Sequence, residues 1–166
     1  MVTYEQASSS LSYDPESGVI VWTRPPAAWI MPGTEAGTVH KASGYRHITL
    51  MRAKFRAHRL AWLLHHGEWP AREIDHINGN RLDNRMANLR LATYAQNQQN
   101  RSRDIRNKSG FTGVSWDKDN RNWRAKICVG RKQHHLGSFA TVEAAAAAYA
   151  KAKAELHTFQ PVQRKT

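Results

Sequence analysis

Four polar side chains between residues 75 and 97 have the types and the spacing of a hydrolytic metal site. A carboxylate and an imidazole are adjacent at Asp75 and His76, and amides follow twelve and twenty-one residues after the histidine, at Asn88 and Asn97. Carboxylate and amide oxygens suit a hard divalent cation, and an imidazole titrates near neutral pH. This set could therefore assemble a compact metal site that hydrolyses a phosphodiester.

The residues around these side chains predict a strand, a loop, a second strand and a helix. Ile74 and Ile77 flank the Asp-His pair on a short strand, and the Asn-Gly-Asn run at 78–80 predicts a tight loop. Residues 89–93 predict the returning strand, and Thr93 is of a type that caps a helix. We expect this order to bring Asp75 and Asn97 together.

The preceding residues predict the elements that support this motif. Turn residues at 13–18 followed by an apolar run at 19–22 indicate a hairpin, and short strands are expected at 36–40, 45–50 and 54–57. Leucines at helical spacing, ended by Gly67, predict a helix over about 58–66 that packs behind the motif.

The stretch from His58 to Asn97 resembles the HNH endonucleases of phage and intron homing systems, whose core is a ββα-metal finger. The Asp-His, Asp-Asn-Arg, Asn-Leu-Arg and Thr-x-x-x-Asn signatures are in register. The resemblance implies a nuclease encoded by a phage or a mobile element, and it implies that hydrolysis leaves 5′-phosphate and 3′-hydroxyl ends.

The resemblance also implies a role for each polar residue. Asp75 and Asn97 would bind one divalent ion, Mg²⁺ or Mn²⁺, and His76 would be the general base. Asn88 would bond the loop backbone and orient His76. The family usually has histidine where this chain has Asn97, and Asn100, one turn further along, is the alternative ligand. Asn78, Asn80 and Asn84 also have a purely structural reading, as residues that satisfy a turn backbone.

The composition favours a polyanionic partner. The 166 residues hold 25 Lys+Arg against 13 Asp+Glu, a formal net charge of +12, which suits a nucleic acid. Residues 1–105 hold 13 basic and 9 acidic side chains, and residues 106–166 hold 12 and 4, so the last third is the more basic part. A ribosomal or membrane-associated protein would also be basic, so composition alone does not decide the class.

Cysteine content and hydropathy restrict the compartment. Cys128 is the only cysteine, so no intramolecular disulfide and no cysteine-based zinc site can form. No basic start followed by an apolar run occurs, and no eighteen-residue apolar stretch, so we expect neither a secretion signal nor a membrane span. A reducing cytoplasm, that of a bacterial host, is the expected location.

A second block follows a basic segment at 105–109. Residues 110–160 contain Gly-Val, Trp-x-Ala-x-Ile, Leu-Gly-x-Phe and an alanine-rich segment, which predict three strands and one helix with Thr141 as its cap. Ala144–Ala148, Tyr149 and Leu156 are expected on the apolar face of that helix. Along the middle strand apolar residues alternate with Arg124, Lys126 and Cys128, so one face of the sheet should be apolar and the other largely basic.

These patterns resemble the AP2 DNA-binding domain, in which a three-stranded sheet lies in the major groove. We expect the helix to be structural, because its surface alanines offer nothing to hydrogen-bond. Several arginines of that family are Thr or Ser here, so its sequence preferences do not transfer. The resemblance implies DNA contacts at eight matching positions: Thr112, Ser115, Trp116, Lys118, Arg124, Lys126, Arg131 and His135.

The sequence thus predicts an α+β protein with an HNH nuclease domain at 1–104, a basic linker at 105–109, an AP2-like domain at 110–160 and a tail at 161–166. We expect a site-selective, homing-type endonuclease that acts on double-stranded DNA without a small-molecule cofactor. We expect it to be a monomer that nicks, with a dimer that cuts both strands as the alternative. A non-catalytic DNA-binding regulator and an RNA-directed protein are the competing classes.

Other candidates carry less chemistry. The adjacent histidines at 65–66 and 134–135 lack further ligands at a suitable spacing, and Cys128 lacks a partner for a catalytic role. A DNA-facing ribbon is a further hypothesis, formed by Tyr45, Arg46, His47, Lys54 and Arg56.

Overall fold

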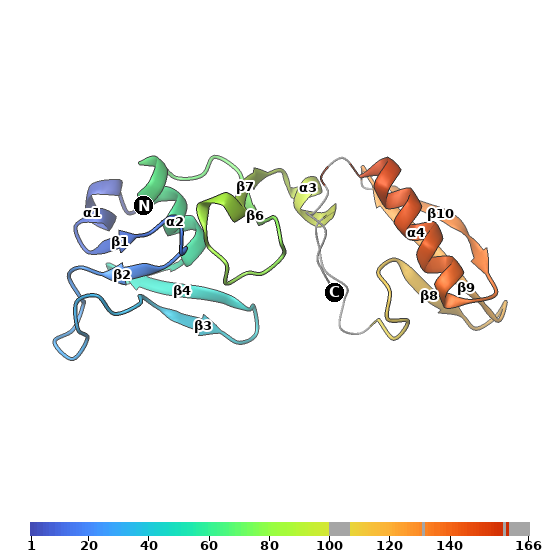
Figure 1. Cartoon of the computed structure of the whole chain (residues 1–166), viewed down its shortest axis with the longest axis horizontal. Coiled ribbons are helices and arrows are strands. Elements are labelled where there is room, and N and C mark those ends of the chain that lie inside the picture. The colour runs from blue at the N-terminus through green and yellow to red at the C-terminus, as the bar shows by residue number, and fades with distance from the viewer. Residues whose placement is uncertain (100–106, 131, 158, 160–166) are drawn as a thin grey trace. The chain divides into compact units, whose positions relative to one another are not determined.

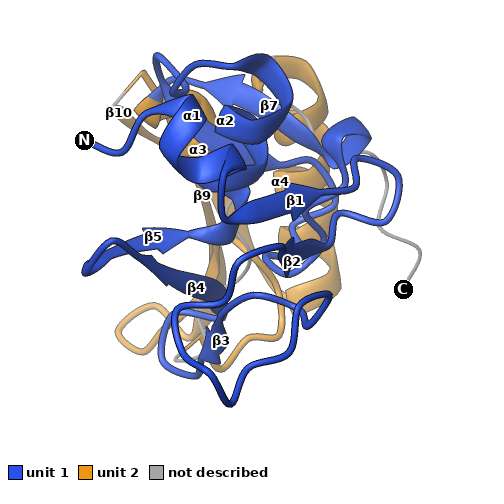
Figure 2. Ribbon diagram, turned by 90° about the vertical axis from the view of Figure 1, so that its left-hand side faces the viewer, with its two compact units in different colours: residues 1–93, 162–166 blue, residues 94–161 orange. Residues whose placement is uncertain are grey.

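A computed structural model describes residues 1–99, 107–130, 132–157 and 159. The chain divides into two compact units, residues 1–93 and residues 94–161 (Figure 2). Asn100, part of the expected linker, Arg131 and the tail at 161–166 lie outside the described residues.

The first unit is built from short antiparallel sheets and two α-helices (Figure 1). Strands β1 and β2 form one hairpin, β3, β4 and β5 form a three-stranded sheet, and β6 pairs with β7. In chain order the elements are α1 (Tyr4–Ser8), β1 (Leu11–Tyr13), β2 (Ile20–Trp22), β3 (Thr38–His40), β4 (Tyr45–Leu50), β5 (Ala53–Arg56), α2 (Ala57–His66), β6 (Glu73–His76), the 3₁₀ turn η1 (Met86–Asn88) and β7 (Leu89–Ala92).

Helix α2 organises the core of this unit. Leu60, Ala61 and Leu63 are fully buried on its inner face, which packs against α1, β1, β4 and β5. The helix ends where Gly67 adopts a left-handed conformation with φ of 79° and donates its N–H to the carbonyl of Leu63. The expected helix and its glycine stop are confirmed.

The β6–β7 pair places the Asp-His pair of the sequence on a buried strand. Asp75 lies opposite Arg90 in the register, and His76 lies opposite Leu89. Helix α3 (Tyr94–Gln99) follows β7 directly. The order of strand, loop, strand and helix is therefore the one expected, and the architecture is of the α+β class.

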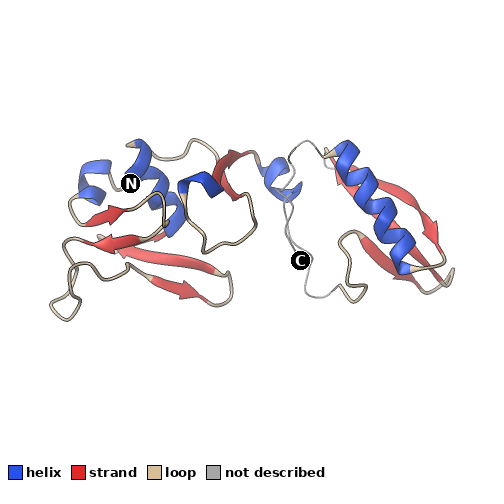
Figure 3. Cartoon of the chain, viewed as in Figure 1, coloured by secondary structure: helices blue, strands red, loops and turns tan. Residues whose placement is uncertain are grey.

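The second unit contains a three-stranded antiparallel sheet and one long helix (Figure 3). Strand β9 (Asn122–Val129) lies between β10 (Lys132–Phe139) and β8 (Val114–Asp117), and α4 (Val142–Leu156) packs against all three strands. The Thr141 hydroxyl accepts the N–H of Ala144 at 3.2 Å, so the expected helix cap is confirmed.

The buried face of α4 is narrower than expected. Ala145 is buried and Ala146, Ala148 and Tyr149 are half-buried, but Ala144, Ala147 and Leu156 are exposed; Ala152 is buried as well. Leu156 is the last residue of the helix, and the next residue, His157, is buried and bonds the carbonyl of Cys128 on β9. None of the described helices is long and apolar enough to cross a membrane.

Candidate active site

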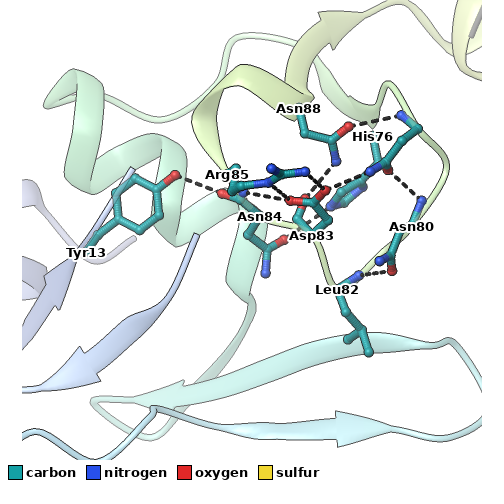
Figure 4. Close-up of polar contacts among 9 residues, drawn as sticks. Tyr13, His76, Asn80, Leu82, Asp83, Asn84, Arg85 and Asn88 are labelled. Carbon is teal, nitrogen blue, oxygen red and sulfur yellow. Dashed lines mark hydrogen bonds and ion pairs between the residues drawn. The ribbon is translucent and has the colours of Figure 1, made fainter. Parts of the chain in front are cut away.

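The imidazole of His76 is the centre of the candidate site. It is 4% exposed, and its Nε2 lies 3.1 Å from Oδ1 of Asn84 (Figure 4). With an amide oxygen as acceptor, Nε2 carries the proton and Nδ1 carries the lone pair. Burial lowers the pKa of His76, and the Asn84 hydrogen bond and the charge of Asp75 only partly oppose that shift. His76 is therefore a neutral imidazole near pH 7, as a general base must be.

Asn88 organises the loop that carries this site. Its Oδ1 accepts the backbone N–H of Asn78 at 3.0 Å, and its Nδ2 donates to the carbonyl of Asp83 at 2.8 Å. The backbone contact expected of Asn88 is present, but the imidazole of His76 donates its hydrogen bond to Asn84. Both amides are buried, and the sequence alone does not distinguish them.

Asp83 holds the same loop together through its carboxylate. Arg85 donates from Nε and Nη2 at 2.8 and 2.6 Å, and Asn78 donates from Nδ2 at 2.7 Å (Figure 4). The hydrogen bonds from Arg85 are the main reason that the pKa of Asp83 falls to about 2. Asp83 is thus an anion at any physiological pH.

The β1–β2 hairpin braces the loop from outside. The Tyr13 hydroxyl donates to the carbonyl of Asn84 at 2.8 Å, and the N–H of Met86 donates to the carbonyl of Pro15 at 3.0 Å. Gly18, with φ of 77°, lies so close to Arg85 that a Cβ there would overlap the Arg85 backbone. The position of Asn84 therefore depends on residues about seventy positions earlier.

A second buried histidine contacts the first. His58, near the start of α2, meets the ring of His76 edge to face at 5.0 Å, and the ring of Tyr45 lies 5.1 Å from His58 and 6.0 Å from His76. Burial lowers the pKa of His58 to about 2, so it is neutral as well. The sequence did not indicate that His58 and Asn84 contact His76; only the Asp-Asn-Arg signature pointed toward Asn84.

Asp75 is buried beside His76 and is oriented by an arginine. Its Oδ2 accepts from Nε of Arg90 at 3.0 Å and lies 2.9 Å from Nη2. A buried carboxylate needs a cation close by, and Arg90, directly across the strand pair, supplies one.

The donors expected to bind a metal are oxygen atoms from two units. Asp75 belongs to the first unit, and Asn97, half-buried on α3, belongs to the second. A carboxylate and an amide oxygen are the donors that Mg²⁺ and Mn²⁺ accept, so the donor chemistry fits such an ion. Within the described ranges no three His, Cys, Asp or Glu side chains gather into a metal-binding group.

The sheet of the second unit separates its expected DNA contacts into two sets. Ser115 pairs with Arg124, and Lys126 pairs with His135, so these four residues share the face opposite to buried Val114 and Ala125. Arg124 forms an ion pair with Asp117. Thr112 and Lys118 lie in the turns that flank β8, and Lys118 is exposed.

Trp116 lies on the other face of the sheet. It is 47% exposed, as expected, but the register pairs it with Trp123, whose ring lies 5.1 Å away. Because side chains alternate along a strand, Trp116 shares the face of Val114, not that of Ser115. Trp116 therefore does not share a face with Arg124 and Lys126.

The adjacent histidines at 65–66 and 134–135 are exposed, as is Cys128. They lie on α2, β10 and β9 and take no part in the hydrogen bonds of the candidate site.

Comparisons with known proteins agree with this geometry. Residues 55–99 match the HNH endonuclease family. Over 103 residues the chain is 37% identical to Protein 3.8 of Escherichia phage T7, a match that covers 61% of this chain and 84% of that protein. The chain therefore belongs to the same family as Protein 3.8, and its residues 55–99 form an HNH endonuclease domain.

A second relative carries the family name itself. The chain is 34% identical over 109 residues to "Uncharacterized HNH endonuclease L560" of Acanthamoeba polyphaga mimivirus, and the match covers 64% of this chain and 55% of that protein. No solved structure matches the chain.

Proposed function

We propose that the protein is a divalent-metal-dependent DNA endonuclease in which His76 is the general base. The observation that carries the proposal is the buried, neutral imidazole, whose Nε2 proton is directed to Asn84 and whose Nδ1 holds the lone pair. In this tautomer Nδ1 can take a proton from a water molecule that attacks phosphorus. Asn88 positions the loop around His76.

Asp75 and Asn97 would hold the ion, Mg²⁺ or Mn²⁺, with Asn100 as the alternative to Asn97. When bound, the ion supplies charge stabilisation to the phosphate and to the departing 3′ oxygen. One site per chain favours nicking by a monomer, and site-selective, homing-type action is part of the proposal. The two relatives are viral proteins, which supports an origin in a phage or a mobile element.

Cleavage of supercoiled plasmid DNA that carries candidate phage and host sequences tests the proposal. The wild type is compared in Mg²⁺, Mn²⁺ and EDTA with His76→Ala and with His66→Ala, a control on an exposed histidine. We expect metal-dependent cleavage that falls by roughly 10²–10⁴-fold in His76→Ala and is unchanged in His66→Ala. Circular dichroism shows whether His76→Ala is folded. Full activity of a folded His76→Ala would reject the proposal.

We also propose that the second unit is an AP2-like module that contacts duplex DNA with its open sheet face. The contacts would come from Ser115, Arg124, Lys126 and His135. Lys126→Gln combined with His135→Gln should weaken binding to duplex DNA. Lys151→Gln, at an exposed residue of α4, should not. Competition with duplex RNA distinguishes this proposal from an RNA-binding protein. Duplex RNA should compete weakly with duplex DNA, because the major groove of A-form RNA is too narrow for a sheet.

One observation favours the alternative, a DNA-binding regulator without catalysis. Arg90 already compensates the charge of Asp75, as a scaffold without a metal would require. Salt-sensitive DNA binding without cleavage, by both the wild type and His76→Ala, would support the regulator.

A further inference from the structure

The ring of Tyr45 has two guanidinium groups stacked near it. The Cζ of Arg56 lies 4.8 Å from the ring centroid, and the Cζ of Arg81 lies 4.9 Å from it. The three residues come from separate segments: Tyr45 begins β4, Arg56 ends β5, and Arg81 belongs to the loop between β6 and β7. Both arginines are exposed.

Neither of these arginines forms an ion pair with a carboxylate within the residues that the structure describes. Arg81 donates from Nη1 to the carbonyl of Ser43 at 2.7 Å, which fixes its side chain across the β3–β4 turn. Four other arginines form ion pairs with carboxylates, namely Arg46, Arg85, Arg90 and Arg124. Two guanidinium groups without a carboxylate partner among the described residues thus lie against one ring, and an anion that binds there would offset their charge.

This pair of cations adjoins the candidate active site. The Tyr45 ring lies 6.0 Å from the ring of His76. A planar guanidinium bonds a phosphate with two parallel N–H groups, and it does so at exposed sites as well. A phosphate bound here would be close along the DNA backbone to the phosphate that lies at His76.

We infer that Arg56, Tyr45 and Arg81 form a binding site for a backbone phosphate of the DNA, next to the phosphate that is hydrolysed. The inference rests on the proposed function and adds a positioning site to it. The site holds the strand near His76, and it is distinct from the sheet of the second unit.

Binding of a short duplex DNA to the full chain tests this site without cleavage. The proteins are His76→Ala as the parent, and the parent with Arg56→Gln plus Arg81→Gln. The matched control is the parent with Arg72→Gln, an exposed arginine before the first residue of β6. Affinity is measured by fluorescence anisotropy in EDTA between 50 and 200 mM salt, and melting temperatures confirm that each variant is folded.

Each phosphate contact contributes about 0.9 to the slope of log affinity against log salt. Loss of this one phosphate contact should lower the slope by about 0.9, so across this fourfold range of salt the parent should lose about three- to fourfold more affinity than the double variant. The control should keep the parental slope. A slope that is unchanged in the folded double variant overturns the inference, as does an equal fall in the Arg72→Gln control.

Cleavage by the same substitutions in an otherwise wild-type chain separates this inference from the proposed function. We expect a higher KM for plasmid DNA with a kcat changed less, because the site holds DNA and does not touch the attacked phosphorus. A wild type that fails to cut rejects the proposed function and leaves the salt slopes to decide the phosphate site. A fall in kcat with an unchanged salt slope would mean that Arg81 only orders the loop, and would overturn the inference.

Discussion

Replacement of Asn84 by aspartate should move the pH dependence of cleavage. In the wild type burial holds the pKa of His76 below its ordinary value of 6.5, so activity should fall on the acid side only below that pH. Asn84→Asp keeps an oxygen acceptor 3.1 Å from Nε2 but adds a negative charge. A charge that close favours the imidazolium and raises the pKa of His76 by roughly 1–3 units.

The consequence is a loss of activity at low pH with recovery at high pH. A rise of about two units leaves on the order of 1% of the imidazole neutral at the pH where the wild type is half-titrated. Single-turnover cleavage from pH 5 to pH 9, at saturating metal, should show the acid limb moved upward by that amount. Asn80→Asp, an exposed position in the same loop whose side chain caps Leu82, is the control and should keep the wild-type limb.

An acid limb at the same pH in Asn84→Asp and the wild type would refute the reasoning. It would mean that the titrating group is not His76, or that Asn84 does not contact it in solution.

Two further predictions concern stability. Gly18→Ala should lower the melting temperature and the cleavage rate more than Gly33→Ala does: both glycines have positive φ, but a Cβ only at Gly18 overlaps the Arg85 backbone. Equal effects would contradict the close packing. Burial lowers the pKa of His58 to about 2, against 6.5 for the unfolded chain. Above pH 6.5 His58 is therefore neutral in both states and does not reduce the free energy of unfolding. Below that pH the unfolded state binds the extra proton, and stability should fall by about 1.4 kcal/mol per pH unit. Urea unfolding between pH 5 and 7.5 should show a shallower fall in His58→Gln, and equal slopes would contradict the assignment.

The elements that carry the candidate site follow from local sequence rules. The spacing of the leucines and the glycine stop define α2, and the Thr141 hydroxyl caps α4 as its position predicts. The Asp-His pair lies on a strand because the flanking isoleucines favour one. Each of these features depends on residues that are close to it in the sequence.

The contacts that select among similar side chains depend on distant residues. The loop contains several asparagines, and only the fold determines that Asn84 reaches the imidazole while Asn88 bonds the backbone. The contact of His58 with His76 joins a helix to a strand eighteen positions later. The strand register, not the family pattern, places Trp116 on the face opposite to Ser115 and Arg124.

The brace formed by the β1–β2 hairpin limits how this nuclease motif can be moved between proteins. The match to the HNH endonuclease family begins at residue 55, whereas the hydroxyl of Tyr13 and the carbonyl of Pro15 secure the loop from much earlier in the chain. A fragment trimmed to the matched residues would keep every proposed catalytic side chain and lose the partners that hold Asn84 in place. Transfer of the proposed activity, by recombination or by protein engineering, therefore requires that the β1–β2 hairpin be transferred together with residues 55–99.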